Sequence, residues 1–192
     1  RDFVGWRDRM FAGDKINESE GRAVLHMALR GSTAPELKVD GERVEDFVNG
    51  ELAKMQALTE KIRNNPEITD VLNIGIGGSD LGPKMVVQAL RPFTNGPRVH
   101  FVSNVDGADL GAKLARLDPK STAVIIVSKT FTTLETMTNA RSVKAWMTES
   151  LNEDEIAERL FAVSSNTEAI ADFGIKADHV LSMRDWISGR YS

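Results

Sequence analysis

A run of polar side chains follows a short apolar segment near the middle of the chain. After the apolar residues 124–127 come Ser128, Lys129, Thr130 and Thr133, with only one aromatic residue among them. A phosphate group offers acceptor oxygens only, whereas hydroxyls and an ammonium group are donors. Charge-assisted hydrogen bonds of this kind contribute roughly 1.5–3 kcal/mol each, and N–H groups at the start of a following helix add to them. The four residues therefore predict a phosphate-binding loop.

A glycine-rich stretch follows another apolar segment, in the sequence NIGIGGSDLGPKM of residues 73–85. Gly75, Gly77 and Gly78 allow a tight turn and a close approach of the backbone to a ligand. Ser79 or Asp80 can cap the next helix, whose N-terminus attracts anions. The stretch is compatible with a second part of a phosphate site, and also with an ordinary turn between a strand and a helix.

Two nucleotide-binding motifs are nearly present in this stretch, and both fail. Gly77-x-x-x-x-Gly82 has Pro83 where a P-loop needs its lysine, and Gly75-x-Gly77-x-x has Asp80 where a dinucleotide fingerprint needs its third glycine. These failures argue against the hypothesis of a nucleotide-binding α/β domain.

Thr132 and Glu135 have the spacing of a capping box, in which a threonine and a glutamate close the first turn of a helix. We expect this capping role for both residues. Contact with a sugar is the second possibility for Glu135.

The elements that position these residues follow from the alternation of short apolar runs with helical patterns after residue 70, which is typical of a parallel sheet covered on both faces. We expect an α/β fold, a three-layer α-β-α sandwich with a flavodoxin-like strand order 2-1-3-4-5. The switch point then lies between the first and third strands, where ligands bind at the carboxyl edge. The expected strands are 71–76, 99–102, 123–127, 160–163 and 179–183. The expected helices between them are 80–91, 107–117, 132–150 and 166–173.

Residues 1–43 are polar and mixed, and we expect them to form a separate N-terminal helical segment. Asn17 and Glu20 can cap a helix that ends near Gly31. A longer helix over 44–62 carries an apolar stripe at three- and four-residue steps.

The composition of the 192-residue chain is 41% hydrophobic and 27% charged, which is ordinary for a globular protein. A net charge of -4 gives no reason to expect nucleic acid. No apolar run approaches the roughly 18 residues of a membrane span, and no leader peptide is visible. The absence of cysteine fits a reducing compartment, so we expect a cytoplasmic location. Because the chain starts on Arg1 and stops on Ser192 with no closing element, we interpret it as a piece of a longer protein.

Four segments in order, GRAVLHMALR, IGIGGSDLGP, SKTFTTLET and DWISGRYS, carry a resemblance to the glucose-6-phosphate isomerase (phosphoglucose isomerase) family. The resemblance spans nearly the whole chain. It implies the sugar isomerase (SIS) fold, with residues 44–192 as the first SIS domain and the second SIS domain absent from this chain.

The activity implied by the resemblance is the interconversion of glucose 6-phosphate and fructose 6-phosphate. A proton moves between two carbons through an enediol, with no cofactor and no metal. Ser128, Lys129, Thr130 and Thr133 match the phosphate loop of the family, and Ser79 matches a further phosphate contact, flanked by Gly78 and Asp80.

Arg190 matches an arginine held near the reacting carbons, where a fixed guanidinium stabilises negative charge. The glutamate, histidine and late lysine of the family's active site lie beyond residue 192, and none of His26, His100 and His179 replaces them. The fragment is therefore expected to be inactive alone, and the full-length enzyme to be a homodimer.

The alternative is a non-catalytic SIS module that senses a sugar phosphate, since such modules share the same phosphate loop. The first and last of the four segments argue against it. The sequence that follows Ser192 in the gene would distinguish the two hypotheses.

Overall fold

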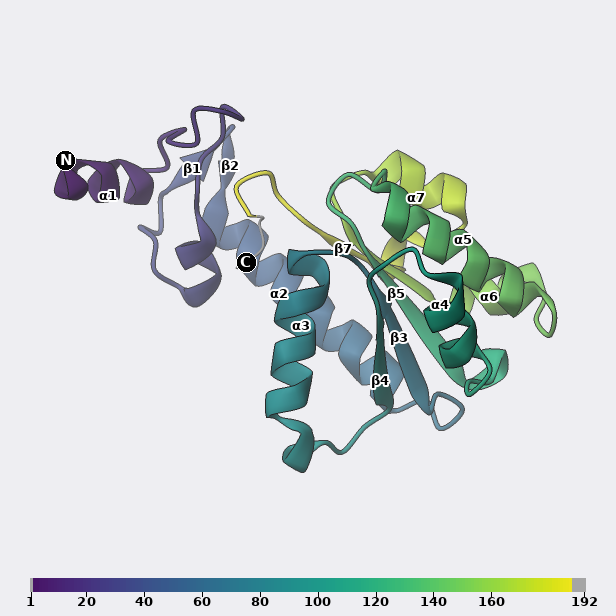
Figure 1. Cartoon of the computed structure of the whole chain (residues 1–192). Coiled ribbons are helices and arrows are strands. Elements are labelled where there is room, and N and C mark those ends of the chain that lie inside the picture. Colours follow the sequence, from purple (N-terminus) through teal and green to yellow (C-terminus); the bar gives the residue numbers. More distant parts are fainter. Residues whose placement is uncertain (1, 188–192) are drawn as a thin grey trace.

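The computed structural model describes residues 2–187 and has a five-stranded parallel sheet at its centre (Figure 1). Its strands lie in the order β4-β3-β5-β6-β7, which is 2-1-3-4-5 when they are counted along the chain and confirms the predicted topology. The bounds are β3 (Asp70–Ile74), β4 (Arg98–Val102), β5 (Thr122–Val127), β6 (Leu160–Ser164) and β7 (Val180–Ser182). The switch point therefore lies between β3 and β5.

Helices cover both faces of the sheet, as the prediction of a three-layer sandwich requires. One face packs on α4 (Gly107–Leu114), α5 (Leu134–Thr148), α6 (Glu153–Arg159) and α7 (Thr167–Phe173). The other face carries α2 (Val44–Arg63), with α3 (Gly78–Ala89) connecting β3 to β4. Successive side chains of a strand point to opposite faces of the sheet. Leu72 and Ile126 pack on the face covered by α4–α7, and Val71 and Ala123 pack on the face covered by α2.

The N-terminal segment is helical at α1 (Phe3–Phe11), but the helix expected over residues 17–31 does not form. Asn17 pairs with Arg22 in an isolated β-bridge, and its side chain donates to Glu20 at 2.8 Å. Gly21 has φ +64° between them, which makes this stretch a turn. Helical backbone resumes only as the short 3₁₀ helix η1 (His26–Arg30), which ends at Gly31.

A two-stranded hairpin, β1 (Lys38–Val39) and β2 (Glu42–Arg43), connects η1 to α2. The apolar residues of this region form a cluster with the first turns of α2 and with the end of the described chain. Its buried members are Ala23, Leu25, Ala28, Val44, Val48, Trp186 and Ile187. The domain boundary at residue 43 stays a prediction.

Helix α6 has seven residues and was not expected from the sequence. It begins with a complete capping box, in which Asn152 accepts from the Glu155 N–H at 3.0 Å and the Glu155 side chain accepts from the Asn152 N–H at 2.8 Å. Within residues 2–187, no helix is both long and apolar enough to cross a membrane.

A buried carboxylate ties β3 to β4 at the amino edge of the sheet. Asp70 is 2% exposed and accepts hydrogen bonds from Arg98 at 2.8 and 2.9 Å, from His100 at 2.7 Å and from Thr69 at 2.8 Å. Burial favours the neutral acid, but these bonds outweigh it and lower the pKa of Asp70 to about 2.

The lowered pKa of Asp70 predicts a pH-dependent contribution to stability. Because the folded pKa lies below the unfolded value of about 3.9, the contribution is complete above that value and is lost as the pH falls toward 2. We expect wild type to exceed Asp70→Asn by about 2 kcal/mol in the free energy of unfolding near pH 5, and by roughly half of that near pH 3. Urea denaturation at both pH values measures this margin, with Asp172→Asn on the exposed surface of α7 as the control. An equal margin at the two pH values would contradict the account.

Candidate functional site

The two predicted loops begin side by side at the switch point. Ile74, the last residue of β3, is paired with Ile126 of β5, so the loops that follow leave the same carboxyl edge. A Cβ on Gly75 would lie 2.7 Å from Ser79 Cβ and 3.1 Å from the Val127 carbonyl oxygen. Only glycine allows the first loop to pass this close to the end of β5.

The first loop turns into α3 at Gly77, whose φ of +61° and ψ of -123° place it where L-residues are strained. The N–H groups of Ser79 and Asp80 close this turn, by donating to the carbonyls of Ile76 and Gly77 at 3.2 Å each. Asn73 Nδ2 donates to the Ser79 carbonyl at 3.2 Å and holds the start of α3 against β3. The half-buried Ser79 side chain therefore lies on a backbone fixed at both ends.

Asp80 belongs to the first turn of α3 and is 5% exposed. Its Oδ1 is buried without a hydrogen-bond partner in the described part of the chain. An ionised carboxylate has only acceptors and has the same sign as a phosphate. The predicted roles of Gly78 and Asp80 in ligand binding stay predictions.

The second loop, residues 128–133, is held by residues at the end of β6. The carbonyl of Lys129 accepts from the Ser165 N–H at 2.9 Å and from the hydroxyls of Ser164 and Ser165 at 2.9 and 2.6 Å. Asn166 Nδ2 donates to the Thr130 carbonyl at 3.0 Å. These three residues were not predicted as part of the site, although a polar run at the carboxyl end of a parallel strand is the signal that would have identified them.

The backbone of the second loop reverses at Phe131, which has φ +55° and is 4% exposed. Its ring packs edge to face on Phe173, with the centroids 5.8 Å apart. Ser128 Oγ lies 3.2 Å from Thr133 Oγ1, and Ser128 is 3% exposed. The buried ring of Phe131 thus anchors the loop at a position between its predicted donors.

The capping box expected at Thr132 and Glu135 is wrong. The N-cap of α5 is Thr133, which makes no side-chain capping bond. Thr132 Oγ1 instead donates to Thr130 Oγ1 at 2.7 Å. Glu135 is half-buried in the first turn of α5, and its contact with a sugar stays a prediction.

Lys129 extends from the second loop to the C-terminal part of the described chain. Its Nζ donates to the Asp185 carbonyl at 3.0 Å, and its side chain is 17% exposed. Arg190, the predicted catalytic arginine, lies outside the described residues, five positions after Asp185.

Two of the histidines lie away from these loops, His100 in the middle of β4 and His179 just before β7. His100 bonds to Asp70, and His179 is fully buried with Nδ1 3.0 Å from the Leu160 carbonyl and Nε2 2.7 Å from Lys61 Nζ. The ammonium of Lys61 can only donate, so this arrangement places the imidazole proton on Nδ1. Neither histidine reaches the two predicted loops through these contacts.

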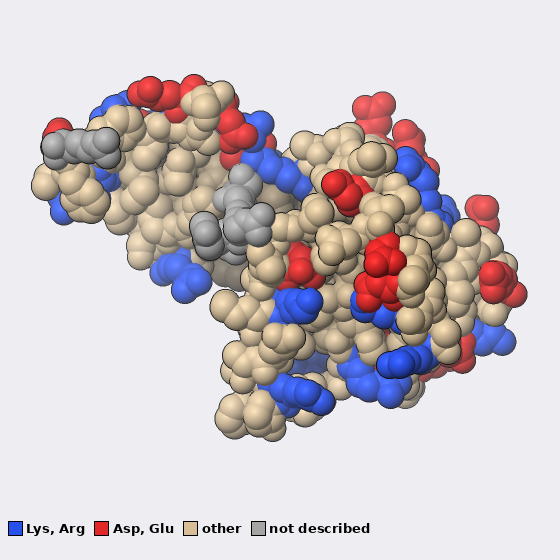
Figure 2. All heavy atoms as spheres, viewed as in Figure 1, with Lys and Arg blue, Asp and Glu red and all other residues tan. Residues whose placement is uncertain are grey.

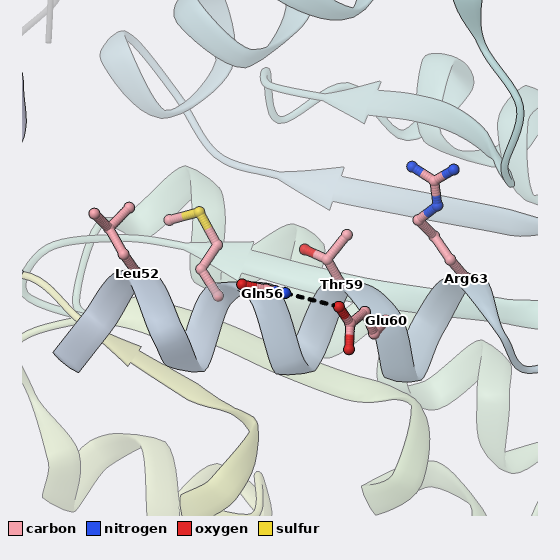
Figure 3. A pocket seen from close by; sticks show the side chains of 6 residues that line it. Leu52, Gln56, Thr59, Glu60 and Arg63 are labelled. Carbon is pink, nitrogen blue, oxygen red and sulfur yellow. Dashed lines mark hydrogen bonds between the residues drawn. The ribbon is translucent and has the colours of Figure 1, made fainter. Parts of the chain in front are cut away.

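Basic and acidic side chains both lie on the face seen in Figure 2, and Lys and Arg are more frequent along its lower edge. A hollow of about 470 Å³ follows the outer side of α2, and its lining side chains all come from that helix (Figure 3). They are Leu52, Met55, Gln56, Thr59, Glu60 and Arg63. None of them belongs to the predicted site.

The fold defines a doubly wound α/β protein whose two polar loops begin at the topological switch point. The family model described as phosphoglucose isomerase matches residues 1–192, and the chain belongs to this family.

Among its relatives, the glucose-6-phosphate isomerase of Cupriavidus taiwanensis is 51% identical over 97% of this chain and 36% of the relative. That of Brucella ovis is 48% identical over 100% and 36%. A solved glucose-6-phosphate isomerase from Chlamydia trachomatis superposes with a TM-score of 0.81 at 28% identity, over 98% of this chain and 37% of that chain. The chain thus spans about a third of the length of these proteins.

The glycines of the first loop give a prediction about stability. Gly75→Ala is expected to lower the free energy of unfolding by about 1–3 kcal/mol, because its Cβ has no space beside Ser79 and Val127. Gly77→Ala meets no atom within 4 Å, but a side chain at φ +61° and ψ -123° should cost about 1–3 kcal/mol. Urea denaturation of the purified chain measures both effects.

Gly111→Ala is the matched control, because Gly111 lies inside α4 with open space around it. It should stabilise the chain by about 0.5–1 kcal/mol. A Gly75→Ala variant as stable as Gly111→Ala would refute the close approach between the first loop and β5.

Proposed function

We propose that this chain is the part of a glucose-6-phosphate isomerase that binds the phosphate of a hexose 6-phosphate. The observation that carries the proposal is the juxtaposition of the two loops at the switch point. Ser79 lies at the start of α3, and Ser128, Lys129, Thr130 and Thr133 follow β5. Family membership over the whole chain supports it, because relatives at 48–51% identity have the name of this enzyme.

The enzyme binds the sugar through its phosphate, which is remote from the carbons that react. A dianion at this site accepts from the Lys129 ammonium and from the hydroxyls of both loops, and the ligand supplies no donors of its own. Binding energy at the phosphate holds C1 and C2 at the groups that move the proton. The phosphate loop therefore contributes orientation rather than proton transfer.

The proton transfer itself, between C1 and C2 through an enediol, needs an acid/base residue that this chain does not supply. Arg190 is proposed to stabilise negative charge on the enediolate oxygens. The glutamate and histidine of the reaction come from the rest of the full-length enzyme. We further propose that this enzyme acts in glycolysis and gluconeogenesis in the cytoplasm, as a homodimer, without a cofactor, nucleic acid or membrane.

Calorimetric titration of the purified chain with 6-phosphogluconate tests the phosphate loop. Lys129→Ala is expected to weaken binding by about tenfold and Thr130→Ala by about threefold, because one charged and one neutral donor are lost. Lys120→Ala is the matched control, since it removes the same charge just before β5, at the amino edge of the sheet. Equal affinities of wild type and Lys129→Ala would overturn the assignment of the loop.

The same preparation should show no turnover of fructose 6-phosphate in a coupled assay. Measurable isomerase activity that copurifies with the chain, and that Lys129→Ala lowers, would contradict the statement that the base lies elsewhere.

A further inference from the structure

Three segments of the chain that are far apart in sequence meet at one carboxylate. Lys129 Nζ donates to the backbone carbonyl of Asp185 at 3.0 Å and lies 3.6 Å from its Oδ1. Arg22 Nη1 approaches the same Oδ1 to 3.9 Å from the N-terminal segment, and it lies 3.7 Å from Glu20 Oε2. The carboxylate of Asp185 is thus shared between a loop cation and a cation that has no place in the phosphate site.

The position of Asp185 is set by its neighbours and not by the ion pairs. Trp186 is 6% exposed, packs edge to face on Phe47 and accepts from the Leu25 N–H at 3.1 Å. On the other side, the Met183 N–H donates to the Ser164 carbonyl at 3.0 Å. The backbone around Asp185 is therefore anchored. Its side chain is 64% exposed, so its carboxylate is accessible from the solvent.

We propose that Asp185 is an internal counter-anion that competes with phosphate for Lys129 and so sets the affinity of the site. This inference rests on the proposed phosphate-binding function. An ammonium has three donors, and the Asp185 carbonyl uses one of them, which keeps Lys129 in place with or without a ligand. The Asp185 carboxylate neutralises part of the positive charge of Lys129. It also repels a phosphate dianion that binds Lys129.

Arg22 has the opposite effect in this arrangement. Because it shares Oδ1 with Lys129, it neutralises part of the carboxylate and reduces the competition. Loss of Arg22 leaves Asp185 to Lys129 alone, whereas loss of the Asp185 charge makes Arg22 irrelevant to the site. If Asp185 only held the site in shape, removing its charge would weaken phosphate binding rather than strengthen it.

The test is calorimetric titration of the purified chain with 6-phosphogluconate. Asp185→Asn keeps the carbonyl and the shape of the side chain, and is expected to tighten binding by about twofold to fivefold, the range of partly exposed ion pairs. Arg22→Gln should weaken binding by up to about twofold. The double variant should match Asp185→Asn, and Asp185→Asn should have little effect in a Lys129→Ala background.

Asp178→Asn is the matched control, because it makes the same change of net charge just before β7, at the amino edge of the sheet. Amide spectra of every variant verify the fold. If wild type binds and Asp185→Asn binds equally or more weakly, or if Asp178→Asn tightens binding as much, the inference is overturned while the proposed function stands. If wild type does not bind, both are overturned.

Discussion

The close approach of Gly75 to the end of β5 is the constraint on which the rest of the site depends. A parallel sheet with its switch point between β3 and β5 sends the two following chains to opposite faces, so the two loops separate after their first residues. They face one ligand only if both turn at the carboxyl edge. The absence of a Cβ at Gly75 allows Gly75 to lie close to both Ser79 and the Val127 carbonyl, and the positive φ of Gly77 completes the turn into α3.

The second loop is organised by the hydrogen bonds of its backbone. Its carbonyls at Lys129 and Thr130 are occupied by donors from Ser164, Ser165 and Asn166. The backbone acceptors of the loop are used in this way, and its hydroxyls and the Lys129 ammonium are the donors that we propose for an anion, although the net charge of the chain is -4. The charged groups at the amino edge, such as Asp70 with Arg98, stabilise the sheet at a distance from this chemistry.

Much of the fold could be predicted because its strands are buried on both faces. Continuous apolar runs such as residues 123–127 leave little alternative to a central strand, and their alternation with helices fixes the class of fold. The candidate loops followed from the topology, since the residues after the first and third strands must meet. The helical propensity of residues 17–31 was overridden by local contacts, in which Asn17 binds Glu20 and Gly21 adopts a positive φ.

Other features depend on contacts that a local pattern does not contain. The spacing of Thr132 and Glu135 is that of a capping box, but the Thr132 hydroxyl donates to the hydroxyl of Thr130 two residues away. Asp185 lies 56 residues after Lys129, and the packing of Trp186 on the N-terminal cluster and the bond from Met183 to Ser164 bring the two together. Ser164, Ser165 and Asn166 form a polar run at the end of β6 that the prediction overlooked, and they bind the backbone of another loop.

Two-dimensional amide NMR of the chain, titrated with 6-phosphogluconate, tests most directly whether the two loops form one phosphate site. The account predicts that shifts are concentrated at residues 77–80 and 128–133 and that both groups titrate with a single affinity. Shifts confined to one loop, different affinities for the two, or no shifts at millimolar ligand would contradict it.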